Sequence, residues 1–122
     1  MPMPRLGFLG LGWIGQHRLQ ALLDEQLCEA VAIADPSPEV QAKARELAPR
    51  AALVDTLDQL LEHALDGVVI ATPSALHAQQ AMQVLERKVA VFCQKPLART
   101  AQETRAVLDA ARQADRVLGC DL

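Results

Sequence analysis

Short apolar runs alternate with longer segments in which apolar positions recur at helical spacing, from one end of the chain to the other. The apolar runs predict six strands, over residues 5–9, 29–34, 51–54, 67–71, 89–93 and 117–120. The longer segments predict five helices, over residues 13–25, 38–47, 57–64, 75–87 and 101–114. Because strand and helix alternate without a hairpin signal, we expect one α/β domain, a doubly wound parallel sheet with helices on both faces.

Polar residues at the expected helix starts support these boundaries. Ser37 precedes the second helix, and either Asp55 or Thr56 precedes the third. Each of these side chains can accept a hydrogen bond from a backbone N–H of the first helical turn. Thr100, with Glu103 three residues later, matches the capping box that marks a helix start. The second, third and last helices are therefore expected to begin directly after these residues.

Residues 10–15 read Gly-Leu-Gly-Trp-Ile-Gly and lie between the first strand and the first helix. The spacing matches the G-x-G-x-x-G turn of dinucleotide-binding sites. In such a turn Gly10 permits the tight bend, Gly12 lets a pyrophosphate approach the backbone, and Gly15 lets the helix pack on the strand. The N–H groups and the positive dipole at the helix start then face the phosphates. The stretch therefore predicts a phosphate-binding turn in a Rossmann-type fold.

Trp13 and Ile14 lie inside this turn and are also candidates for contact with a cofactor. The Trp13 ring could lean over the pyrophosphate, point toward a substrate cleft, or pack within the protein. The sequence leaves these alternatives open.

Asp35 directly follows the second strand. A carboxylate at that position can accept hydrogen bonds from the adenosine ribose of a dinucleotide. A 2′-phosphate there would meet a like charge, so Asp35 favours NAD over NADP. Its alternative role is that of a turn residue before Pro36.

The composition narrows the possible function classes. The 122 residues suffice for one domain with a hydrophobic core, and the net charge is −3, with acidic and basic residues interspersed. That balance, and the scarcity of aromatic residues, argue against a nucleic-acid partner. No apolar run approaches the roughly 20 residues of a membrane span. Three scattered histidines and three widely spaced cysteines predict no metal site, and the cysteines are expected to be reduced thiols of a cytoplasmic protein.

Two further segments resemble a known family. Residues 71–77 read Ala-Thr-Pro-Ser-Ala-Leu-His, and residues 94–98 read Gln-Lys-Pro-Leu-Ala. Together with the glycine turn they resemble the glucose–fructose oxidoreductase and inositol dehydrogenase family (Gfo/Idh/MocA), whose pattern is roughly A-T-P-x-x-x-H, a helix, a glycine, a strand and E-K-P-L-A. The resemblance covers nearly the whole chain. It implies an NAD-dependent oxidoreductase that transfers a hydride between the nicotinamide cofactor and a sugar, polyol or similar hydroxy compound.

The resemblance also implies roles for particular residues. Thr72 and Pro73 would border the nicotinamide side of the cofactor, and His77 would lie near a cofactor ribose. Lys95, presented by the loop at Pro96, would be the catalytic residue and would contact both cofactor and substrate. It would bind the substrate hydroxyl and help its proton leave. This is chemically reasonable, because a cation stabilises the alkoxide that forms as the hydride departs.

Three departures from the family pattern bear on function. Gln94 stands where glutamate is usual, and Lys88 stands where a turn glycine is usual. The family's second domain, which supplies most of the substrate pocket and the usual oligomer interface, has no counterpart in residues 1–122. We therefore expect residues 1–122 to be the dinucleotide-binding domain of a longer enzyme, for which a homo-oligomer is the candidate assembly. Alone, it should bind NAD without turning over substrate and should expose apolar surface near residues 117–122.

One alternative is a stand-alone NAD-binding sensor or interaction module without catalysis. Such a module needs the glycine turn and Asp35 but no lysine on the substrate side, so Lys95 favours an enzyme. A second alternative is the same fold with NADP as its cofactor.

Overall fold

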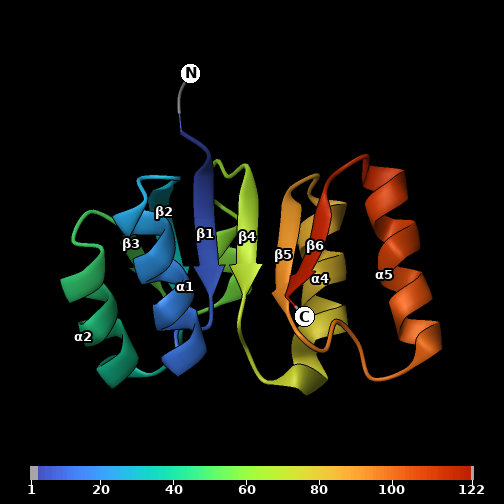
Figure 1. The fold of residues 1–122 in the computed structure, drawn as a ribbon, viewed down its shortest axis with the longest axis horizontal. Helices are drawn as coiled ribbons and strands as arrows, with labels where there is room; N and C mark the ends of the chain where they lie inside the picture. The colour runs from blue at the N-terminus through green and yellow to red at the C-terminus, as the bar shows by residue number, and fades with distance from the viewer. Residues whose placement is uncertain (1–2, 122) are drawn as a thin grey trace.

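The structure is a computed structural model that describes residues 3–121, in which six strands alternate with five α-helices (Figure 1). The strands are β1 (Arg5–Leu9), β2 (Glu29–Ala34), β3 (Ala52–Val54), β4 (Gly67–Ile70), β5 (Ala90–Gln94) and β6 (Leu118–Asp121). The helices are α1 (Trp13–Asp24), α2 (Pro38–Leu47), α3 (Leu57–Leu60), α4 (His77–Glu86) and α5 (Ala101–Ala114), with a 3-10 turn, η1 (Ser74–Leu76), before α4. Each predicted element is present, and most boundaries fall within two residues of those expected.

The strands form one sheet in the order β3-β2-β1-β4-β5-β6, and all neighbouring pairs are parallel. The chain builds outward from β1 to β3, returns to β4 on the other side of β1, and then continues to β6. The strand order therefore reverses between β1 and β4. This confirms the doubly wound, Rossmann-type fold predicted from the sequence.

Alternate residues of the central strands enter two separate hydrophobic cores. Phe8 of β1 faces the core that is shared with α1 and α2, whereas its neighbour Leu9 faces the core shared with α3, α4 and α5. Figure 1 shows α1 and α2 over one face of the sheet and α4 over the other. Both faces of β1 and β4 are thus covered, which explains why these strands read as continuous apolar runs.

The face of β5 on the α1 and α2 side is the exception. No helix within the described residues covers it, and Phe92 is 39% exposed there. Val117, which precedes β6, is 75% exposed and joins Phe92 in lining a shallow apolar hollow of about 170 Å³. The apolar surface expected near residues 117–122 is therefore present, although Leu122 itself lies outside the described residues.

The third and fourth helices differ from the sequence prediction in length. The third helix was expected to reach residue 64, but α3 ends at Leu60. The chain must turn here to bring β4 beside β1, and two hydrogen bonds between Arg5 and Asp66 hold that junction: the Arg5 N–H donates to the Asp66 carboxylate at 2.7 Å, and the Asp66 N–H donates to the Arg5 carbonyl at 2.7 Å. The fourth helix begins as the 3-10 turn η1, so regular α-helix starts only at His77.

The predicted helix caps form. Ser37 accepts from the Val40 N–H, and Thr56, rather than Asp55, caps α3 in a complete capping box with Gln59. Thr100 accepts from the Glu103 N–H at 3.1 Å, while the Glu103 carboxylate accepts from the backbone N–H of Arg99 at 3.0 Å. Hydrogen bonds from Arg99 lower the pKa of Glu103. In a standard capping box the Glu103 carboxylate would accept from the N–H of Thr100, the N-cap residue. Here it accepts from the residue before, Arg99.

Lys88 occupies the turn between α4 and β5 where the family pattern has glycine. Its φ is +61°, in the left-handed region that glycine favours, and its side chain is exposed. The Lys88 N–H donates to Leu85, and its carbonyl accepts from Arg116, so the turn keeps its backbone bonds despite the side chain. The turn therefore tolerates lysine at some conformational cost.

Replacing Lys88 with glycine should stabilise the protein. The substitution removes about 1–2 kcal/mol of strain from the left-handed backbone conformation. Glycine also costs about 0.5–1 kcal/mol, because it loses more conformational entropy on folding. The free energy of unfolding should therefore rise by about 0.5–1 kcal/mol. Urea denaturation measures the free energy of unfolding. The control is Arg87→Gly, one residue earlier at φ −87°, which should destabilise. A Lys88→Gly variant no more stable than the unmodified chain would contradict the account.

Candidate functional site

The carboxyl ends of the parallel strands bring the predicted site residues to one edge of the sheet. The glycine turn follows β1, Asp35 follows β2, Thr72 and Pro73 lie just after β4, and Lys95 comes directly after β5. Figure 1 shows the strand arrows ending along this edge. In open α/β sheets, ligands bind outside this edge at the point where the strand order reverses.

Gly10 makes the turn that leaves β1, and only glycine fits there. Its φ is +82°, and its N–H donates to the Ala34 carbonyl at 2.8 Å. A Cβ at this position would lie 3.0 Å from the carbonyl group of Ala71 and 2.9 Å from the methyl carbon of Thr72. The turn therefore passes between the ends of β2 and β4 without room for a side chain.

Gly12 and Gly15 serve different purposes in the same motif. A Cβ on Gly15 would lie 2.6 Å from the Gly10 carbonyl oxygen, so its absence lets α1 sit against the turn. A Cβ on Gly12 would meet nothing within 4 Å, because its α-carbon faces open space. Packing within the described residues therefore does not account for glycine at position 12, whereas close approach of a ligand to the backbone does.

The start of α1 has unsatisfied backbone donors. Gly12 is its N-cap residue, no side chain within the described residues caps it, and its first turn contains no acidic residue. By contrast, α2, α3 and α5 each begin with a serine or threonine that accepts a backbone N–H. The N–H groups at the start of α1 and its positive dipole are therefore available to an anion beside Gly12.

Asp35 is half-buried and anchors the glycine turn to the end of β2. One of its carboxylate oxygens accepts from the Leu11 N–H at 3.0 Å, and the other accepts from the Ser37 N–H at 2.9 Å. The bond to Ser37 is the turn role that the sequence offered as an alternative, and the bond to Leu11 was not predicted. Each carboxylate oxygen retains a further lone pair, so Asp35 can still accept from a ligand hydroxyl.

His77 lies at the expected helix start but is buried. Its side chain is 1% exposed, with Nδ1 2.7 Å from the Pro96 carbonyl oxygen and Nε2 2.7 Å from the Thr72 carbonyl oxygen. Both ring nitrogens are therefore already engaged within the protein. Direct contact of His77 with a cofactor ribose stays a prediction, and the observed bonds give it a role in joining the two loops.

Thr72 and the residues after it close the other side of the glycine turn. The Thr72 side chain stands over Gly10, and its hydroxyl donates to the side-chain oxygen of Gln80 in α4. Pro73, the N-cap residue of η1, is exposed beside it. These two residues thus lie at the strand-order reversal between β1 and β4. That they border the nicotinamide side of a cofactor stays a prediction.

Lys95 is exposed at the carboxyl end of β5, and its peptide bond to Pro96 is cis. Its neighbour Gln94 accepts a hydrogen bond at 3.3 Å from the guanidinium of Arg18 in α1. The amide in place of the usual glutamate therefore still links β5 to α1, although without a negative charge. This contact gives Arg18 a role that the sequence did not suggest.

Trp13 does not pack within the protein, because 74% of its surface is exposed. The one ring neighbour found for it among the described residues is His17, whose centroid lies 4.2 Å away with the ring planes tilted by 59°. Ile14, also in the first turn of α1, is 40% exposed. Of the alternatives raised by the sequence, internal packing is wrong for Trp13, and contact with a ligand or another surface stays open.

The cysteines are unsuited to nucleophilic chemistry. Cys93 lies two residues before Lys95, but burial, with a smaller contribution from nearby Cys120, raises its pKa to about 12. Burial also raises the pKa of Cys28. The thiols therefore stay protonated near neutral pH. Within residues 3–121, no group of three or more histidine, cysteine or acidic side chains could hold a metal ion, and none of the helices is long and apolar enough to cross a membrane.

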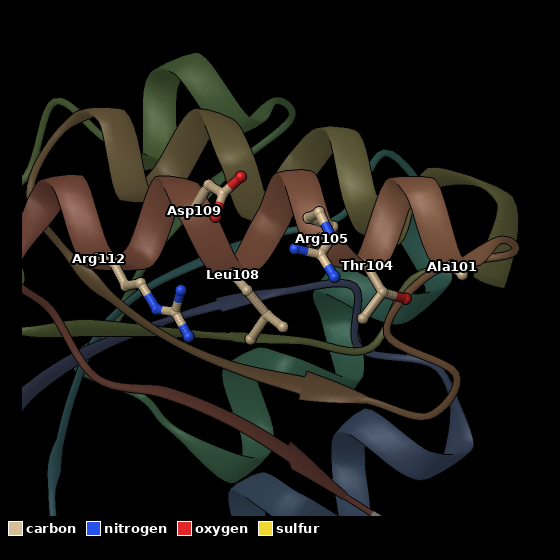
Figure 2. Close-up of a pocket in the computed structure, with 6 residues that line it drawn as sticks. All are labelled: Ala101, Thr104, Arg105, Leu108, Asp109 and Arg112. Carbon is tan, nitrogen blue, oxygen red and sulfur yellow. The ribbon is translucent and has the colours of Figure 1, made fainter.

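The hollow in Figure 2 lies away from these residues. It measures about 410 Å³ and is lined by side chains of α5 alone, among them Arg105, Leu108 and Arg112. None of them belongs to the edge formed by the carboxyl ends of the strands. The candidate site is therefore the open backbone at Gly12 and the residues around the glycine turn, and this hollow is a feature of the helix surface.

Comparison with known proteins gives consistent matches. The model of the GFO_IDH_MocA family, described as an oxidoreductase family with an NAD-binding Rossmann fold, matches residues 4–122. The rhizopine catabolism protein MocA of Rhizobium meliloti is 34% identical over 111 residues, which cover 89% of this chain and 34% of that protein. The scyllo-inositol 2-dehydrogenase (NADP⁺) IolU of Bacillus subtilis (strain 168) is 31% identical over 114 residues, or 90% of this chain and 34% of that enzyme.

A solved structure shows the same fold. The WlbA dehydrogenase from Bordetella pertussis, in complex with NADH and UDP-GlcNAcA, superposes with a TM-score of 0.90 at 28% identity. The match covers 98% of this chain and 37% of that protein. The chain thus spans about a third of the length of the relatives it matches.

The three glycines of the turn should respond differently to alanine. Gly10→Ala should cost about 2–3 kcal/mol of unfolding free energy, because alanine at φ +82° is strained and overlaps Ala71. Gly15→Ala should also destabilise, whereas Gly12→Ala should cost less than about 1 kcal/mol because its Cβ enters open space. Chemical denaturation of the three variants gives the order. If Gly12→Ala destabilised the chain as much as Gly10→Ala, Gly12 would have a packing role.

Proposed function

This chain belongs to the Gfo/Idh/MocA family of oxidoreductases, and from that membership we propose that it is the cofactor-binding domain of an NAD-dependent dehydrogenase. The reaction we propose is transfer of a hydride between the nicotinamide and a sugar, polyol or similar hydroxy compound. The observation that carries the proposal is the open backbone at Gly12, beside the uncapped start of α1 and the carboxylate of Asp35. Taken together, these features are better explained by a bound dinucleotide than by a structural role.

The residues present fit the parts of NAD. The N–H groups at the start of α1 would receive the pyrophosphate, with Gly12 admitting it to the backbone and Trp13 and Ile14 beside it. Asp35 would accept from the ribose hydroxyls while it holds the turn through Leu11. Its negative charge supports NAD over NADP, since a 2′-phosphate would be repelled.

Lys95 would act on the substrate. Bound NAD supplies the acceptor for the hydride. The Lys95 ammonium, exposed after β5, would bind the substrate hydroxyl and stabilise the developing alkoxide as its proton leaves. Thr72 and Pro73 would border the nicotinamide side of the cofactor. A non-catalytic NAD sensor has no observation in its favour, because it needs no exposed lysine at this place.

The length of the relatives supports a larger functional unit. Since the chain spans about a third of their length, we propose that residues outside it complete the substrate pocket and supply a homo-oligomer interface. Residues 1–122 would then be one dinucleotide-binding domain. Thiols at Cys28, Cys93 and Cys120 support a cytoplasmic location, and the acidic charge balance supports the absence of a nucleic-acid partner.

Titration with NADH and NADPH tests the role of Asp35. NADH should bind about tenfold more tightly than NADPH. Asp35→Asn should weaken NADH binding by about tenfold, because the charge is lost but an acceptor remains. The difference in affinity between NADH and NADPH should narrow in this variant. Gly12→Ala should weaken both cofactors alike. Asp109→Ala, on the outer side of α5, is the matched control and should change neither. Equal affinity of the unmodified chain for NADH and NADPH would contradict the proposal that Asp35 binds the ribose hydroxyls and repels a 2′-phosphate.

The chain alone should not turn over substrate. Mixed with NAD and a panel of inositols, sugars and sugar acids, it should produce no NADH absorbance, since the substrate pocket is proposed to be completed elsewhere. The cofactor titration above serves as the positive control for a folded site. Substrate-dependent formation of NADH by the purified chain would overturn the proposal that residues outside it complete the substrate pocket.

A further inference from the structure

His77 is the one polar or charged side chain that the structure classes as buried among the described residues. It is the first residue of α4, and 1% of its surface is exposed. The proposed chemistry assigns it no direct step, because both ring nitrogens are engaged within the protein. A buried polar side chain is stable only where its hydrogen bonds are made within the protein.

Both partners of the ring are backbone carbonyls of site loops. Nε2 lies 2.7 Å from the Thr72 carbonyl oxygen, in the turn after β4. Nδ1 lies 2.7 Å from the Pro96 carbonyl oxygen, in the loop after β5 that begins with Lys95. Carbonyl oxygens only accept, so the proton of such a hydrogen bond comes from the ring. Both ring nitrogens thus face backbone atoms of the two site loops.

We propose that His77 is a positioning residue that ties the Thr72 turn to the Lys95 loop through its two ring nitrogens. On one side, the Thr72 side chain stands over Gly10, so the tie reaches the glycine turn. On the other, the Pro96 carbonyl is one residue beyond Lys95. The imidazole therefore sets the distance between the nicotinamide side of the proposed cofactor site and the lysine, an inference that rests on the proposed function for its catalytic meaning.

Histidine suits this role because its two nitrogens point in different directions from one rigid ring. An asparagine amide nitrogen occupies roughly the place of Nδ1, and a glutamine amide nitrogen roughly that of Nε2. His77→Asn should therefore keep the bond to Pro96 and lose the bond to Thr72. His77→Gln should keep the bond to Thr72 and lose the bond to Pro96. The pair of variants cuts each side of the tie separately.

The first measurement follows Lys95. Reductive methylation with ¹³C-formaldehyde labels all three lysines of the chain, Lys43, Lys88 and Lys95, for NMR. The Lys95 signal should move in His77→Gln and stay near its original place in His77→Asn, while the Lys43 and Lys88 signals stay fixed in both. His63→Gln, at the opposite edge of the sheet, is the matched control and should move none. A Lys95 signal that ignores both variants, or moves no more than the other two, overturns the proposal.

The second measurement follows the ring itself in the unmodified chain. ¹⁵N spectra of the three histidines should show a ring N–H protected from solvent exchange for the signal that persists in both His17→Gln and His63→Gln, because the His77 ring is buried and hydrogen-bonded. Rapid exchange of that ring N–H overturns the tie. Because the assignment uses no His77 variant, this spectrum decides the question even if both substitutions at His77 prevent folding.

The third measurement links the tie to cofactor binding. NADH affinity should fall by about two- to tenfold in His77→Asn, which frees the Thr72 turn, and change less in His77→Gln. The reverse order overturns the proposal. If the unmodified chain binds no NADH, the proposed function fails, whereas the lysine and ring signals still decide whether His77 joins the two loops.

Discussion

Parallel pairing of β1 with β2 on one side and β4 on the other is the constraint on which the site depends. It brings the loops after three strands to one edge, and the reversal of strand order sends α1 and α4 to opposite faces. The turn after β1 must then pass between the ends of its two neighbours. That passage is narrow: the Gly10 N–H binds the Ala34 carbonyl, and the Ala71 carbonyl stands where a side chain would be. The passage itself therefore requires glycine at position 10.

Single polar side chains hold the site loops to one another. Asp35 binds the N–H of Leu11, His77 bridges two carbonyls, and the Arg18 guanidinium reaches Gln94. Each bond joins segments that follow different strands, so each limits a motion that packing alone does not restrict. Gln94, which stands where the family usually has glutamate, keeps one such bond and lacks the negative charge of a carboxylate. The local electrostatics near Lys95 can therefore vary while the geometry of the edge is preserved.

Sequence reasoning was strongest where the cause is local. Strand and helix patterns, the caps at Ser37 and Thr100, and the glycine spacing all depend on residues within a few positions of one another, and each is confirmed by the structure. It was weakest where partners are distant. Nothing near His77 reveals the Pro96 carbonyl, 19 residues further along the chain, so its burial and its two backbone contacts could not be predicted from the sequence. The bonds between Arg5 and Asp66, which hold the junction after α3, likewise join residues 61 positions apart.

The uncapped start of α1 bears on the stability of the protein. Ser or Thr at the start of α2, α3 and α5 accepts a hydrogen bond from a first-turn amide, whereas no side-chain cap is formed at Gly12. A dinucleotide that binds the folded chain and not the unfolded one would add about 2.7 kcal/mol at a hundredfold excess over its dissociation constant. That is a sizeable part of the stability of a domain this small. Resistance to heat and proteolysis would then follow the nicotinamide pool of the cell, and the helix start proposed to bind the cofactor would make the lifetime of the protein depend on its supply.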